Sequence, residues 1–202
     1  MHAWESRIVA RFTEHLIYYP KEVWTLELDD NSMGGDAILD ELRTIAFLDG
    51  ALEIPASHVL RSSESQTNWG ASGSFAEYLI EVSVNLAGGA GAAGLGVVVK
   101  SVFDRIQKRS SQERDPLTTE QARSLVKAHI ALHYGIQTDS LVEKKSMHSL
   151  SDGVKEFTFA SQDGVEFGGA IGGSDPARCT RVWSSNPSPV LRPEYSHIST
   201  DE

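Results

Sequence analysis

The chain has 202 residues, and its 18 lysines and arginines stand against 28 aspartates and glutamates, a formal net charge of −10. This acidic balance argues against a broad nucleic-acid surface, because phosphate contacts need clustered lysines and arginines. Cys179 is the only cysteine, which excludes an internal disulfide and any C-x-x-C metal or redox site.

The first third of the chain predicts a helix, a strand and a second helix. Residues 3–20, AWESRIVARFTEHLIYYP, place apolar side chains four apart, which is typical of a helix that Pro20 would end. Residues 23–30, VWTLELDD, alternate apolar and polar side chains and predict a half-buried strand. Residues 34–50 predict a helix with Asp36 as N-cap, Gly50 as stop and one apolar face formed by Ile38, Leu42, Ile45 and Leu48.

The middle of the chain predicts two short strands, a loop and a long helix. The strands are ALEI at 51–54 and HVLR at 58–61, and the Ser/Gly-rich loop covers residues 62–74. Residues 75–109 are interpreted as mainly helical, through a run of glycines. The polar segment QKRSSQERDP at 107–116 then predicts a hinge and a domain boundary.

The last part of the chain predicts one helix followed by strands. Residues 117–135, LTTEQARSLVKAHIALHYG, form the clearest helix, with a capping box at Thr118 and Gln121 and a stop at Gly135. Asp163-Gly164 lies between two strand-like runs and predicts a hairpin turn. RCTRVW, at 178–183, predicts a last strand, and residues 186–202 predict a loose tail with three prolines.

These elements predict an α+β fold with an N-terminal β-α-β unit, a long Gly/Ala-rich helix, a second helix and a small antiparallel sheet. We expect two domains and a tail. Residues 1–110 form an α/β unit ending in the glycine-rich helix, residues 111–185 a helix with antiparallel hairpins, and residues 186–202 a flexible tail.

The glycine stretch NLAGGAGAAGLGVVVK, at 85–100, has three interpretations. Gly89, Gly91 and Gly94 spell G-x-G-x-x-G, the fingerprint of a dinucleotide-binding turn, but no second strand with an acidic end follows at the required distance. Residues 82–99 carry no charge over 18 residues, the lower limit for a membrane span, although five of them are glycines. We favour the third interpretation, a smooth helix that another backbone approaches closely.

The smooth helix is our candidate for an interface with a protein partner or with a second copy. Five glycines in a helix cost on the order of 4–5 kcal/mol relative to alanines, which close packing has to offset. Apolar residues lie on both sides of the glycines and extend the face. The expected interface consists of Gly88, Gly89, Gly91, Gly94, Val98 and Phe103.

The order of elements resembles a known family. A strand (WTLELDD), a helix (ILDELRTIAFLDG), a short strand (ALEIPASHVL), a polar loop and a Gly/Ala-rich helix ending in VVVKSVFDRIQKRS resemble the effector-associated constant component of actinobacterial multi-gene conflict systems. The hairpin VKEFTFASQDGVEFGG is similar to the Asp-Gly hairpin of those proteins. This chain adds an N-terminal helix and the helix at 117–134. The resemblance implies an accessory protein encoded beside variable effectors, with no catalytic residues of its own.

His129 and His133 lie one helical turn apart on the apolar face of the clearest helix. This spacing can supply two metal ligands, but HIALH lacks the glutamate of a zinc-protease motif and no third ligand is evident. We therefore expect two packed histidines, with a metal site or a pH switch near pH 6 as the alternatives. Cys179 lacks an activated-cysteine signature, no G-x-S-x-G occurs, and no catalytic residues are expected.

The sequence therefore predicts a non-catalytic adaptor or scaffold of a bacterial defence or conflict system, acting through protein–protein contact. We expect no cofactor, no metal and no nucleic acid, and a protein partner that is an effector or a second copy. The N-terminus lacks a secretory signal, so we expect a cytoplasmic protein, with membrane association as an alternative. The alternative functions are a membrane-inserting effector using residues 82–99 and a nucleotide-binding enzyme using Gly89 to Gly94.

Overall fold

The protein is an α+β fold built on one large sheet. The computed structural model describes residues 4–16, 18–28, 33–47, 56–67, 73–83, 89–109, 117–149, 153–172 and 178–185. In chain order the elements are β1 (Trp4–Thr13), β2 (Glu22–Leu28), α1 (Gly35–Arg43), the 3-10 turn η1 (Thr44–Phe47), β3 (His58–Thr67), β4 (Gly73–Ser83), α2 (Gly89–Gln107), α3 (Thr119–Tyr134), the 3-10 turn η2 (Thr138–Ser140), β5 (Val142–His148), β6 (Lys155–Ala160), β7 (Glu166–Ile171) and β8 (Arg178–Ser184).

The sheet has eight strands in the order β3-β4-β1-β2-β8-β7-β6-β5. All neighbours are antiparallel except β1 and β4, which run in parallel. The expected α+β class is confirmed, but the expectation of a small antiparallel sheet was wrong. Because β2 pairs with β8, strands from both ends of the chain belong to the same sheet. The proposed division near residue 110 stays a prediction.

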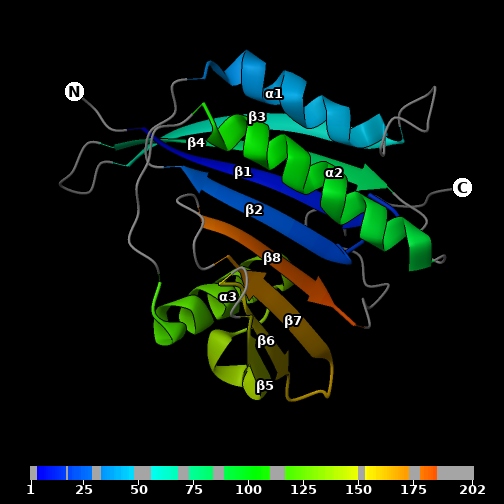
Figure 1. The fold of residues 1–202 in the computed structure, drawn as a ribbon, viewed down its shortest axis with the longest axis vertical. Coiled ribbons are helices and arrows are strands. Elements are labelled where there is room, and N and C mark those ends of the chain that lie inside the picture. Colours follow the sequence, from blue (N-terminus) through cyan, green and yellow to red (C-terminus); the bar gives the residue numbers. More distant parts are fainter. Residues whose placement is uncertain are drawn as a thin grey trace, which may run out of the picture.

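Helices cover the two faces of the sheet at different places. Helices α1 and α2 lie side by side over β3, β4, β1 and β2, whereas α3 lies behind the β8–β7–β6 part (Figure 1). Each face has its own hydrophobic core. The first core joins α1 and α2 to Ile8, Leu26 and Ile80, and the second joins α3 to Phe157, Phe159 and strand residues of the opposite face.

The predicted N-terminal helix was wrong, because residues 4–13 form strand β1. A spacing of four residues is even, so it places side chains on one face of a strand as well as on one face of a helix. Ile8 and Phe12 enter the first core, while Val9 enters the second. Burial on both faces removed the apolar–polar alternation by which a strand is recognised.

The predicted loop at 62–74 and the start of the long predicted helix were also wrong. Residues 62–67 continue β3, residues 73–83 form β4, and α2 covers Gly89–Gln107, whereas residues 68–72 and 84–88 lie outside the described residues. The polar run Ser62–Thr67 has weak strand propensity, and its pairing with β4 stabilises the extended backbone. In β4, Tyr78, Ile80 and Val82 face the first core, and Leu79 faces the second.

Other predicted elements were confirmed. Residues 22–28 form β2, the helix at 34–50 corresponds to α1 and η1, and the β2-α1-β3 connection is the expected β-α-β unit, with β1 and β4 lying between its two strands. Gly34, not Asp36, is the N-cap of α1, and Asp36 lies in its first turn. HVLR opens β3, and RCTRVW lies in β8.

Helix α3 and the β6–β7 hairpin match the sequence most closely. The Thr118 side chain accepts from the Gln121 backbone N–H and the Gln121 side chain accepts from the Thr118 N–H, so the predicted capping box is present. Gly135 ends α3 with a φ of 67°, and Gly164 turns the hairpin with a φ of 81°. The predicted strand at 51–54, Leu48, Gly50, Gly88, most of the hinge and the tail from residue 186 lie outside the described residues.

Candidate functional site

Helix α2 contains most of the residues predicted to form an interface. Gly89, Gly91 and Gly94 lie in its first six residues, and Val98 is partly buried beside the first core. Phe103 is only 2% exposed and packs into that core with Val99, Val102 and Ile106. Its ring is therefore occupied by the chain's own sheet, and it does not belong to an exposed interface.

One glycine of α2 lies against the sheet. A Cβ built on Gly96 would lie 3.4 Å from Cζ2 of Trp24, a residue of β2. The glycine-rich helix thus meets an indole of its own sheet at this position. Part of the smooth surface predicted from the sequence is used inside the monomer.

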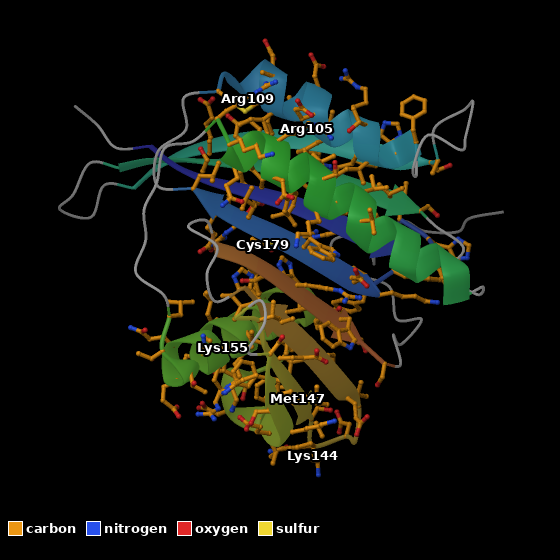
Figure 2. The ribbon with its side chains drawn as sticks, in the orientation of Figure 1. Arg105, Arg109, Lys144, Met147, Lys155 and Cys179 are labelled. Atoms are coloured by element: carbon orange, nitrogen blue, oxygen red, sulfur yellow. The ribbon has the colours of Figure 1, made fainter. Side chains whose placement is uncertain are left out.

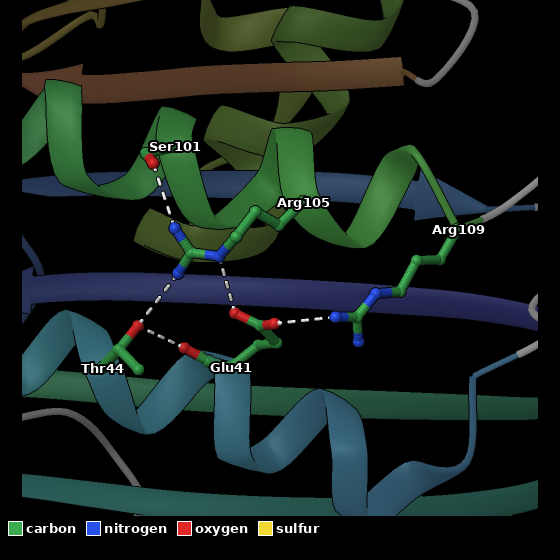
Figure 3. Close-up of polar contacts among 5 residues, drawn as sticks. All are labelled: Glu41, Thr44, Ser101, Arg105 and Arg109. Atoms are coloured by element: carbon green, nitrogen blue, oxygen red, sulfur yellow. Dashed lines mark hydrogen bonds and ion pairs between the residues drawn. The ribbon is translucent and has the colours of Figure 1, made fainter.

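The outward side of α2 combines one apolar side chain with basic residues. Val97 is 67% exposed, and Lys100, Ser101 and Lys108 are exposed as well. Toward the end of the helix, Arg105 Nε donates to Glu41 Oε2 of α1 at 2.8 Å (Figure 3). Arg109 lies 3.6 Å from the other oxygen of Glu41, so this carboxylate holds α1 and α2 together.

A second cluster surrounds the two histidines of α3. The rings of His129 and His133 are 4% and 5% exposed and stack with their centroids 5.9 Å apart. His133 Nε2 lies 3.4 Å from Oγ1 of Thr25, and His129 Nε2 lies 3.8 Å from Oε1 of Glu27. The prediction that both histidines lie on the buried face of this helix is confirmed.

Burial keeps both histidines neutral at physiological pH. Desolvation lowers the pKa of His133 to about 3, and the nearby charges of Arg11 and Arg7 and the His129 ring act in the same direction. Desolvation also lowers the pKa of His129, against the attraction of Glu27. The two Nδ1 atoms have no hydrogen-bond partner within the part of the chain that the structure describes. The pKa of His133 does not fit a switch near pH 6.

The geometry of the pair is poor for a shared metal ion. Each Nε2 faces a different residue of β2, whereas two ligands of one ion must converge on a single point. Arg7 already lies beside the Glu27 carboxylate at 3.3 Å and beside Glu77 at 3.7 Å. Within the described ranges, no group of three or more His, Cys, Asp or Glu residues is placed to hold a metal.

The structure also reveals an aromatic ladder that the sequence analysis missed. The Arg181 guanidinium lies over the rings of Trp24 and Trp183, with its central carbon 5.4 and 4.9 Å from their centroids. Arg181 also donates to Glu22 at 2.8 Å. Trp24 pairs with Arg181 across β2 and β8, and Trp183 lies on Gly168 of β7. No signal in the sequence predicts that β2 and β8 are neighbours.

The glycine motif has a strand before it and a helix after it, β4 and α2. Because α2 begins at Gly89, Gly91 and Gly94 lie inside the helix and not in a turn. Strand β4 has one parallel neighbour, β1, and one antiparallel neighbour, β3. None of the helices in the described part of the chain has the length and apolarity needed to cross a membrane. Cys179 is half-buried.

Comparisons with protein-family models, with curated proteins and with solved structures found no match for this chain.

Proposed function

We propose that the protein is a non-catalytic adaptor or scaffold that binds a protein partner through the outward side of α2. The observation that carries this proposal is Val97, a large apolar side chain left 67% exposed on a helix whose inner side is filled by its own core. Contiguous apolar patches with a polar rim are typical of protein interaction sites, and we infer that Val97 and the Gly/Ala-rich run before it in α2 form such a patch.

The composition of α2 supports this assignment. Small residues before Val97 allow another backbone to approach closely, while Lys100 and Lys108 provide a basic margin. Such a surface fits a partner with an acidic rim around an apolar centre, because potentials at interfaces are complementary. The resemblance to the effector-associated constant component would place that partner among the variable effectors of a bacterial defence or conflict system.

A pair of matched valines tests the proposal. Val97 on α2 and Val142 on β5 are 67% and 58% exposed, so each can be changed to aspartate without disturbing a core. The partner is isolated from the source cells with the tagged wild-type chain, identified and purified, and its Kd is then measured by calorimetry. We expect Val97→Asp and Gly91→Leu to weaken binding by tenfold or more, and Val142→Asp to leave it unchanged.

Circular dichroism of each variant checks that the fold is retained. Equal affinity of all three variants, or a loss confined to Val142→Asp, would place the partner elsewhere and contradict the proposal. Flotation of the chain with anionic liposomes would support the membrane alternative instead. Flotation should be absent if α2 binds a protein partner.

A nucleotide-binding role is a second candidate, favoured by the order of strand β4, glycines and helix α2. It predicts that NAD or NADP raises the melting temperature, because a ligand that binds only the folded state stabilises it. Gly89→Leu would abolish that shift. No shift at millimolar dinucleotide would remove this candidate.

A further inference from the structure

The two edge strands of the sheet differ in the features that hinder pairing with a further strand. Strand β5 forms one edge, and its register with β6 is interrupted by a bulge between Glu143 and Lys145. Lys144, Lys145 and Met147 of this strand are exposed, and Figure 2 shows Lys144 and Met147 at this end of the sheet. Bulges and lysines at an edge hinder the addition of a further strand.

Strand β3 forms the other edge and has none of these features. It is ten residues long and pairs with β4 in an unbroken register from His58 to Thr67. It contains no lysine and no proline, and the side chains from Arg61 to Glu64 are exposed. Among the described strands none pairs with its outer side. About half of its residues direct their backbone N–H and C=O groups to that side.

We propose that the outer edge of β3 pairs antiparallel with β3 of a second copy of this chain. A twofold pair requires an edge that complements itself. The residues from 61 to 64 include one arginine, one glutamate and two serines, so the edge has no net charge. This inference does not rest on the proposed function.

The register that best fits this strand is centred on Ser63. Ser63 then faces its own copy, Ser62 faces Glu64, and Arg61 faces Ser65, so no like charges are directly opposite. A register centred on Ser62 would instead place Leu60 opposite Glu64. The twofold axis lies perpendicular to the sheet, and α1 and α2 of both copies fall on the same face. Val97 stays free for a different partner.

Two serines on opposite edges of the sheet provide a matched test. Ser63 lies on β3 and Ser146 on β5, and both are exposed. Sedimentation velocity over roughly 1 to 200 µM, the range suited to a small interface, should show a concentration-dependent dimer of the full chain. Ser63→Lys places two ammonium groups opposite each other and should give a monomer. Ser146→Lys should leave the dimer intact.

A covalent cross-link tests the register without adding charge. In a Cys179→Ser background, Ser63→Cys should form a disulfide-linked dimer on mild oxidation, because opposed Cβ atoms lie about 4.5–5.5 Å apart and a small backbone shift brings them to the roughly 3.5–4.5 Å of a disulfide. Ser146→Cys should stay monomeric. A wild-type chain that sediments as a monomer throughout overturns the proposal, as does cross-linking only through position 146. Partner binding through Val97 is measured separately, so failure of one proposal leaves the other standing.

Discussion

His129 and His133 are two neutral imidazoles held between α3 and the sheet, and their energetic role follows from that position. Desolvation disfavours the imidazolium form, because a buried charge loses its hydration. In the unfolded chain both rings would titrate near pH 6.5. The folded and unfolded states therefore bind different numbers of protons between pH 6.5 and the lowered pKa values of the folded protein.

We expect acid to destabilise the protein through His133. Its pKa is about 3 in the folded state, so below pH 6.5 the unfolded chain takes up a proton that the folded chain does not. The free energy of unfolding should fall by about 1.4 kcal/mol between pH 7.5 and 5.5 from this group alone. Urea unfolding at both pH values should show a smaller fall for His133→Gln than for the wild type. An equal fall in unfolding free energy for both proteins would mean that His133 titrates normally in the folded protein.

At the scale of elements, the contact between α3 and β7 depends on the absence of a side chain. A Cβ built on Gly169 would lie 2.2 Å from Cγ1 of Val126, far inside van der Waals contact. The neighbouring Gly168 is similarly covered by the Trp183 indole, on the other face of the strand. Strand β7 thus accepts a helix on one side and a tryptophan on the other.

We expect Gly169→Ala to lower the free energy of unfolding by about 1–3 kcal/mol, because the added methyl overpacks the contact with α3. In the double variant with Val126→Ala the cost should be less than the sum of the single changes, because the second change removes the clashing methyl groups. Gly96→Ala is the control: its Cβ would make an ordinary contact with Trp24, and alanine favours a helix. A larger loss of unfolding free energy in Gly96→Ala than in Gly169→Ala, measured by urea denaturation, would contradict this prediction.

At the scale of the whole molecule, the two cores share strands. Ile8 and Leu26 of β1 and β2 lie in the first core, and Val9 and Val23 of the same strands lie in the second. The α3 helix therefore packs on residues from both ends of the chain. The Trp24–Arg181–Trp183 ladder crosses the β2–β8 junction on the opposite face from α3.

We expect a single cooperative unfolding transition, because neither core can be lost without exposing the other. Far-ultraviolet circular dichroism follows the helices, and fluorescence follows the four tryptophans of the chain, of which Trp24 and Trp183 lie at the junction. Both signals should give the same urea midpoint. Two separate midpoints would show that residues 1–110 and 111–185 unfold independently, as the proposed division near residue 110 implies.

Elements with local signals were predicted correctly from the sequence. The capping box and terminal glycine delimit α3, Asp163-Gly164 marks the β6–β7 hairpin, and strict alternation marks β2. The burial of His129 and His133 also follows from the helical period of α3. These features depend on residues within a few positions of each other, which a single sequence displays.

Strands β1 and β4, the second half of β3 and the order of the sheet depend on contacts between remote residues, which appear only in the folded protein. Ile8 pairs with Tyr78, and Leu26 with Cys179, so the partners that fix these strands are remote in the chain. Burial on both faces removed the alternation of β1, and backbone pairing with β4 made a strand of the polar residues from Ser62 to Thr67. The aromatic ladder, the partners of the histidines and the difference between the two edges also depend on residues far apart in the chain, so the sequence analysis did not predict them.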